Sequence, residues 1–198
     1  MKNYFYLLMI SFLILGCGQK APRNYPNTHK DIIAFGDSLT YGYGAGSTQS
    51  YPAYLSDMIG RDVINLGVNG DTSSAGLARI SELYRYKPYM VLVEFSANDF
   101  FRKVRKKETE QNLRQIVAQI QKMGAIVVLV DTGGGAPMNA YTKMQEKIAK
   151  DYDALFVPGI MNDIFNKTYL KSDEIHPNAA GYKIIAGKVK DVIENYLK

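Results

Sequence analysis

The sequence predicts a flavodoxin-like α/β fold of three layers (α/β/α), in which helices cover both faces of a five-stranded parallel sheet. Two observations support this prediction. From residue 31 onward, short apolar runs alternate with segments of helical period, as in parallel sheets covered by helices. Polar clusters follow the first three apolar runs, where open α/β sheets place their ligands. The chain has 198 residues, of which 46% are hydrophobic and 22% are charged, and this length and composition suit one domain with a substantial core.

Five apolar runs are expected to form the strands, because a parallel strand buried on both faces is apolar along its length. They span residues 32–35, 63–66, 90–95, 125–130 and 154–157. The clearest helix between them covers 109–123, with Leu113, Ile116 and Ile120 on one face and Gly124 to end it. A final helix is expected over about 178–196.

The N-terminal residues have the pattern of a secretion signal. A short positive head is followed by an apolar run over 4–15 that is too short to span a bilayer as a mature helix. The run ends at Gly16 and Cys17, the only cysteine, and resembles the lipobox of bacterial lipoproteins. We therefore expect a lipoprotein signal peptide over 1–16, a tether over 17–30 that starts at a lipidated Cys17, and a single folded domain over 31–198. The alternative is an ordinary cleaved signal with an incidental cysteine.

Ser38 follows the first predicted strand and is a candidate nucleophile. A serine hydroxyl needs an imidazole to take its proton, and the imidazole needs a carboxylate to orient it. His176 is the only plausible base, because the other histidine, His29, lies in the expected tether. Asp173 precedes His176 by three residues and can turn back to it. The alternatives are that Asp37 or Ser38 only caps a helix and that His176 is an ordinary loop residue.

Acyl transfer also needs hydrogen-bond donors for the developing oxyanion. Three are available: the backbone N–H of Ser38, the loop at Gly70, where glycine permits close approach of a ligand, and the carboxamide of Asn98. The alternatives are that Gly70 only forms a turn before a helix and that Asn98 only marks the exit from a strand. Asp37 is expected to brace the turn that presents Ser38.

Four blocks of this chain together resemble the SGNH (GDSL) hydrolase superfamily. They are Gly36-Asp37-Ser38-Leu39, Gly70, Asn98-Asp99 and Asp173-x-x-His176. The runs 36–44, 49–53, 69–73 and 109–116 are further similar to the small bacterial arylesterases, thioesterases and lysophospholipases. The resemblance implies the SGNH hydrolase fold, with Ser38 as nucleophile, His176 as base and Asp173 as the orienting acid. It also implies an oxyanion hole of Ser38, Gly70 and Asn98. Ser96 departs from the family, which usually has glycine there.

The expected function is therefore a serine esterase that cleaves ester or thioester bonds through an acyl-enzyme on Ser38. Its expected partners are a small acyl ester or lysophospholipid and, through Cys17, a membrane of the bacterial cell envelope, on the periplasmic side or at the cell surface. An O-acetylesterase acting on envelope polysaccharide is the enzymatic alternative. A non-catalytic envelope lipoprotein that binds glycans or lipids is the alternative of another class.

Three further features bear on ligands. The glycine-rich loop at Gly133 and Gly134 lacks the lysine and hydroxyl of a phosphate loop, and is either a wall of the substrate pocket or a turn. Phe100 is a candidate substrate contact, as is Asp37. The aromatic and cationic run 100–107 is either a solvated loop or a surface for anionic headgroups. The formal charge of +5 without a basic stripe argues against nucleic acid, and we expect no cofactor and no metal.

Overall fold

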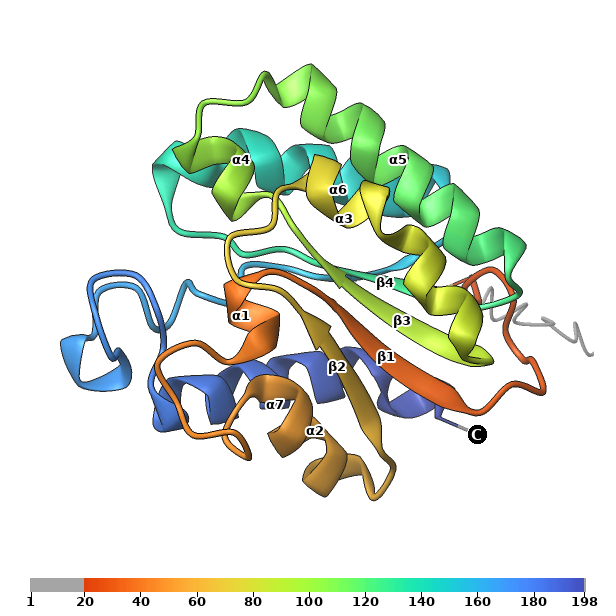
Figure 1. The fold of residues 1–198 in the computed structure, drawn as a ribbon, viewed down its shortest axis with the longest axis horizontal. Helices are drawn as coiled ribbons and strands as arrows, with labels where there is room; N and C mark the ends of the chain where they lie inside the picture. The colour runs from red at the N-terminus through yellow and green to blue at the C-terminus, as the bar shows by residue number, and fades with distance from the viewer. Residues whose placement is uncertain (1–19, 198) are drawn as a thin grey trace, which may run out of the picture.

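The computed structural model describes residues 20–197, which form a five-stranded parallel sheet between two layers of helices (Figure 1). The strand order is β2-β1-β3-β4-β5, and each pairing is parallel. The strands are β1 Asp31–Gly36, β2 Val63–Gly67, β3 Pro88–Glu94, β4 Ile126–Val130 and β5 Leu155–Val157. The predicted fold class is confirmed, and each of the five predicted runs overlaps one strand.

Helices cover both faces of the sheet (Figure 1). On one face lie α2 (Tyr51–Ile59) and α7 (Ala179–Ile193), and on the other lie α3 (Ser73–Ala78), α5 (Lys106–Lys122) and α6 (Asn139–Asp151). Two short helices follow strands, α1 (Ser38–Tyr41) after β1 and α4 (Ala97–Phe101) after β3. Short 3-10 segments occupy 80–85, 136–138, 168–170 and 194–196.

Alternating side chains of each strand fill the two cores. In β1, Ile32 and Ala34 join the core under α2 and α7, while Ile33 and Phe35 join the core under α3, α5 and α6. All four side chains are fully buried. Burial of an isoleucine or phenylalanine side chain contributes about 1.5–3 kcal/mol, so β1 is held at the centre of the sheet by both layers. The rigid position of β1 fixes the turn that follows it.

The helices expected from sequence are present with shifted ends. The helix expected over 109–123 begins earlier, at Lys106, because the charged residues before Thr109 are good helix formers and need no apolar period to join it. The final helix, α7, begins after Asn178, whose side chain accepts the N–H groups of Ala180 and Gly181. It ends at Ile193 and continues as a 3-10 turn over 194–196.

The expected tether is only partly within the described residues. Cys17 and the expected signal peptide lie outside them. Residues 20–30, part of the predicted tether, instead hydrogen-bond to residues at the amino ends of β3 and β4 and at the end of α5. Within 20–197, no helix has the length and apolar character needed to cross a membrane.

Candidate active site

Ser38 is the first residue of α1, directly beyond the carboxyl end of β1. Asp37 caps this helix, and its Oδ1 accepts the backbone N–H of Leu39 at 3.0 Å. The turn is packed closely, since a Cβ added at Gly36 would lie 2.1 Å from Oγ1 of Thr40. The end of β1 and the cap therefore hold Ser38 in one place, with its side chain in the wall of a pocket.

Ser38 and His176 are brought together across the length of the chain. The Oγ of Ser38 lies 3.1 Å from Nε2 of His176, and Nδ1 of the same ring lies 2.8 Å from Oδ2 of Asp173. The other carboxylate oxygen, Oδ1, accepts the backbone N–H groups of Ile175 at 2.8 Å and His176 at 2.7 Å. Such a chain of hydroxyl, imidazole and carboxylate can deprotonate a serine and stabilise the imidazolium that forms.

The charge of Asp173 is set by its hydrogen bonds. Burial raises the pKa of Asp173, but the bonds from the backbone N–H and the imidazole of His176 outweigh this effect and lower the pKa to about 2. The carboxylate is therefore ionised at neutral pH. It is available to balance a positive charge on the imidazole.

The loop that carries Asp173 and His176 is closed at its base. Lys171 and Pro177 form an antiparallel bridge, and the Ser172 N–H donates to the carbonyl of His176 at 2.9 Å. The ring of Tyr43 packs on the imidazole, with 4.5 Å between centroids. Sequence analysis missed Tyr43, because one tyrosine among several in a loop carries no local signal of such a contact.

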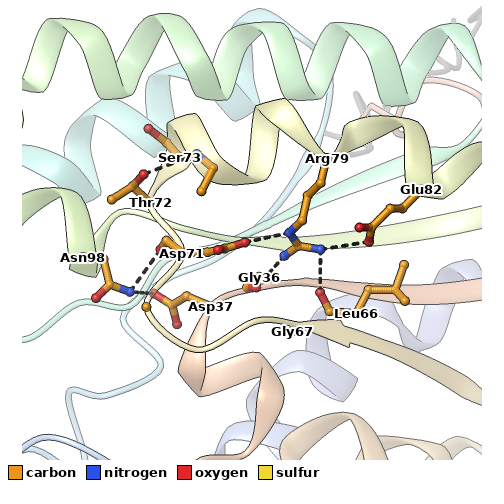
Figure 2. Close-up of polar contacts among 12 residues, drawn as sticks. Gly36, Asp37, Leu66, Gly67, Asp71, Thr72, Ser73, Arg79, Glu82 and Asn98 are labelled. Atoms are coloured by element: carbon orange, nitrogen blue, oxygen red, sulfur yellow. Dashed lines mark hydrogen bonds and ion pairs between the residues drawn. The ribbon is translucent and has the colours of Figure 1, made fainter.

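Gly70 and Asn98 line the same pocket as Ser38, Gly70 from the loop after β2 and Asn98 as the second residue of α4. Figure 2 shows the Asn98 side chain directed toward Asp37 and Asp71. Gly70 has a φ of 81°, a conformation that favours glycine. The carboxamide of Asn98 donates to Oδ2 of Asp37 at 2.9 Å and to the Asp71 carbonyl at 3.0 Å. Asn98 Nδ2 is thus held between the nucleophile turn and the Gly70 loop.

Arg79, at the end of α3, ties these loops together and was missed by sequence analysis (Figure 2). Its Nε lies 2.6 Å from Oδ2 of Asp71, and both side chains are largely buried, at 15% and 13% exposed. Nη2 donates to the Gly36 carbonyl and Nη1 to the Leu66 carbonyl, each at 3.0 Å. The guanidinium lies 4.3 Å from the ring centroid of Phe35. Arg79 thereby joins the carboxyl ends of β1 and β2 to the loop that contains Gly70.

Two buried carboxyl groups lie behind the nucleophile turn. Glu94, at the end of β3, accepts the hydroxyl of Thr40 at 3.2 Å and that of Thr132 at 3.1 Å. The Asp37 N–H lies 3.4 Å from Oε2 of Glu94. Burial, reinforced by the charge of Glu94, raises the pKa of Asp37 well above its usual value, and burial also raises the pKa of Glu94. The pair thus keeps a proton to higher pH than isolated carboxyl groups do.

Ser96, which departs from the family glycine, is held with a φ of 134°. L-residues rarely adopt this conformation, and it costs about 1–3 kcal/mol. The side chain is buried, and its Oγ accepts the Nε2–H of Gln145 at 3.1 Å. The serine therefore both strains the backbone and adds a polar contact, while Asn98 still reaches the site.

The pocket beside Ser38 has a volume of about 420 Å³. All four residues proposed from sequence as substrate contacts line it, namely Asp37, Phe100, Gly133 and Gly134. Further apolar side chains complete the wall, including Leu39, Phe101, Pro137, Met138, Met161, Phe165 and Ile175. The arrangement suits an acyl group. Among residues 20–197, no group of three or more His, Cys, Asp or Glu side chains is placed to hold a metal ion.

The aromatic and cationic run 100–107 divides between the pocket and the surface. Phe100 and Phe101 end α4 and line the pocket. Arg102 donates from Nη2 to the Gly70 carbonyl at 2.8 Å, so it supports the neighbouring loop. The remaining five residues, 103–107, are mostly exposed, and Lys106 begins α5. The start of the run therefore belongs to the pocket and its supporting loop, and the rest lies at the surface.

Known proteins resemble this chain over most of its length. Residues 34–184 match the model of the GDSL-like Lipase/Acylhydrolase family. Thioesterase 1/protease 1/lysophospholipase L1 of Escherichia coli strain K12 is 33% identical over 164 residues, which cover 78% of this chain and 79% of the relative. An arylesterase of Vibrio mimicus is 29% identical over 178 residues, 84% of this chain and 89% of the relative.

A solved structure has the same arrangement of elements. The crystal structure of the psychrotrophic esterase EstA from Pseudoalteromonas sp., inhibited by monoethylphosphonate, superposes with a TM-score of 0.76 and 28% sequence identity. The match covers 85% of this chain and 98% of that one. The agreement therefore extends over nearly all of the relative's domain.

Proposed function

This chain belongs to the GDSL-like lipase/acylhydrolase family and is a serine esterase, and we propose that Ser38, His176 and Asp173 carry out its reaction. The observation that supports these roles is the 3.1 Å approach of Ser38 Oγ to His176 Nε2. His176 takes the proton as Oγ attacks the ester carbonyl and a tetrahedral intermediate forms. It then gives the proton to the leaving alcohol or thiol. A water molecule, activated by the same imidazole, releases the acid from the acyl-enzyme.

In this proposal the backbone N–H groups of Ser38 and Gly70 and the carboxamide of Asn98 stabilise the oxyanion. Each such donor typically lowers the barrier by about 3 kcal/mol. The Asn98 carboxamide either turns an N–H group from Asp37 or Asp71 toward the oxyanion, or donates one N–H to both the present acceptor and the oxyanion. The placement of all three residues around one pocket supports this assignment.

A fluorophosphonate probe tests the nucleophile, because it forms a stable phosphonyl ester only on an activated serine. We expect one label on Ser38, and none in Ser38→Ala. His176→Ala should label at least 100-fold more slowly while folding normally by circular dichroism. Folded wild-type protein that does not react, or that reacts at another serine, would overturn the assignment.

We propose simple acyl esters and thioesters, lysophospholipids among them, as substrates. The apolar lining of the pocket and the names of the relatives, which include a thioesterase and lysophospholipase and an arylesterase, support this class. Rates on p-nitrophenyl esters of increasing chain length, compared with acetylated sugars, test it. Faster hydrolysis of medium-chain esters than of acetylated sugars is expected, and the reverse order would favour the polysaccharide O-acetylesterase.

We also propose that the chain is a lipoprotein of the bacterial cell envelope, with its signal peptide over 1–16 and lipid on Cys17. The support is the sequence alone, a short positive head and an apolar run that end at the only cysteine. Cys17→Ser should move the enzyme from the membrane fraction to the soluble fraction or block its processing. If Cys17→Ser fractionates in the same way as wild type, the proposed lipid anchor at Cys17 is refuted.

A further inference from the structure

Residues 20–30 cross the amino ends of the strands before the chain enters β1 (Figure 1). Nζ of Lys20 lies 2.8 Å from the carboxylate of Asp153, and the Arg23 N–H donates to the Asp153 carbonyl at 2.8 Å. Asp153 precedes β5. The Asn24 side chain donates to the carbonyl of Ala125, the residue before β4, at 2.9 Å. The segment is thus fixed first at β5 and then at β4.

The same segment continues along the amino end of β3. Nδ2 of Asn27 donates to the Tyr89 carbonyl at 3.2 Å, and Nδ1 of His29 lies 3.0 Å from the Pro88 carbonyl. The ring of Tyr25 packs edge-on against Tyr196, with 5.2 Å between centroids. These contacts join residues far apart in the sequence, so this part of the chain has a fixed place on the domain. That place is the amino end of the sheet.

The catalytic pocket lies at the opposite end. Ser38 follows the carboxyl end of β1, a strand of six residues that extends about 20 Å at ~3.3 Å per residue. Gly70 and Asn98, in the same pocket, follow the carboxyl ends of β2 and β3. The segment 20–30 and α1, which begins with Ser38, therefore lie at opposite ends of the sheet (Figure 1).

The anchor proposed above is close to the fixed segment in the sequence. Only two residues lie between Cys17 and Lys20, so the three steps along the chain from Cys17 to Lys20 span at most about 11 Å even when fully extended. A lipid on Cys17 must therefore enter its membrane near the amino end of the sheet. It cannot reach past the domain to the pocket side.

Resting on the lipid anchor of the proposed function, we propose that the anchored enzyme stands with the amino end of its sheet toward its own membrane and its pocket facing away. Its substrates are then acyl esters that arrive from the aqueous side, and lipids of the leaflet that holds the anchor are excluded. The cations of the run 102–107 follow β3 and lie on the pocket side, so they do not contact the anchoring membrane.

Vesicles that carry the lipidated full-length enzyme test this orientation. Two substrates are compared: a soluble p-nitrophenyl ester, and a diacyl phospholipid with a fluorogenic ester that does not leave the bilayer. The same phospholipid dispersed in detergent gives the rate of hydrolysis when the orientation of the enzyme on a bilayer no longer limits access to the pocket. We expect the detergent rate to exceed the bilayer rate at least tenfold, while the soluble ester reacts equally in both. Equal rates on the phospholipid in bilayer and detergent would overturn the orientation.

A variant that frees the segment gives the complementary result. Replacing Lys20, Asn24, Tyr25, Asn27 and His29 together by alanine removes the side-chain contacts described above, and the 13 residues 18–30 can then extend about 45 Å. The bilayer rate should rise severalfold with the soluble-ester rate unchanged. Lys147→Ala, which removes an exposed ion pair with Asp151 on α6, is the matched control and should behave as wild type. A freed variant no faster than the control would also overturn the proposal.

A second variant covers the case in which the freed variant does not fold. A Gly-Ser segment of about 20 residues inserted between Gln19 and Lys20 lengthens the reach without touching the docked contacts, and should raise the bilayer rate in the same way. Cys17→Ser separates the two proposals. If vesicles retain wild type and Cys17→Ser equally, the lipid anchor is refuted, and the orientation that rests on it is refuted as well. If retention requires Cys17 but bilayer lipid is cleaved freely, only the orientation falls.

Discussion

Replacement of Arg79 should damage both stability and turnover, because this side chain holds two strand ends and the Gly70 loop together. Arg79→Gln leaves the largely buried Asp71 carboxylate without its partner, and breaking such a pair costs about 3–5 kcal/mol. The hydrogen bonds to the Gly36 and Leu66 carbonyls contribute about 1 kcal/mol each. Since glutamine retains one of these bonds and water reaches the pair, we expect a loss of about 4 kcal/mol.

Arg79→Lys separates charge from geometry. Lysine keeps the pair with Asp71 but has no planar fork to reach both carbonyls, so the expected loss is about 2 kcal/mol. Urea unfolding measures these changes. With a short p-nitrophenyl ester, kcat should fall about tenfold to 100-fold, because Asp71 and Asn98 lose their positions and the oxyanion loses part of its stabilisation. KM should change little, since the apolar wall of the pocket is untouched.

Glu82→Gln is the control for both variants. Glu82 is 39% exposed and meets Nη1 of Arg79 at 3.4 Å, a contact worth less than about 0.5 kcal/mol. The reasoning would be refuted if Arg79→Lys kept full kcat and lost no more stability than Glu82→Gln. If Arg79→Gln does not fold, Arg79→Lys and Asp71→Asn together still test the link to turnover.

Three further predictions concern single side chains. Ser96→Gly should be more stable than Ser96→Ala by about 1 kcal/mol or more in urea unfolding, because both lose the bond to Gln145 but only glycine relieves the backbone at φ 134°. Asp173→Asn removes the stability that the ionised carboxylate gives the folded state. The difference in stability from wild type should be largest above the ordinary carboxyl pKa and should vanish as pH falls through about 2. Melting temperatures measured across this pH range test it, and a difference that does not change with pH would contradict it. The raised pKa values of Asp37 and Glu94 mean that folding stability declines as pH rises from the ordinary carboxyl range toward those values. Glu94→Gln should flatten this decline in the same melting series, and an unchanged slope would contradict the buried pair.

Much of the fold follows from local pattern. The runs over β1 and β4 are continuously apolar because both faces of those strands are buried, and the structure places strands there. Ser38 could be predicted because it follows a predicted strand, and His176 because the other histidine lies in the expected tether. Their 3.1 Å approach depends on the parallel sheet that the same pattern predicts.

The parts that sequence did not predict depend on contacts between distant residues. Arg79 looks like a surface position of a helix, yet it bonds to Gly36, 43 residues away. Glu94 ends an apolar run, and nothing local shows that it meets Asp37. Asn24 lies in a stretch rich in proline and asparagine that has the composition of a linker. Its bond to Ala125, 101 residues away, is what docks that stretch on the domain.

Ser38 and His176 are 138 positions apart in the sequence, so the two side chains can meet only after most of the domain has been synthesised and has folded. The proposed nucleophile follows the first strand, and the proposed base lies in the last loop before α7. A chain that is still being synthesised, or that is threaded unfolded through a membrane pore, has the serine without the imidazole. Prematurely ended chains likewise have an unactivated hydroxyl. With the proposed catalytic pair, hydrolysis therefore begins only where and when the whole domain has folded.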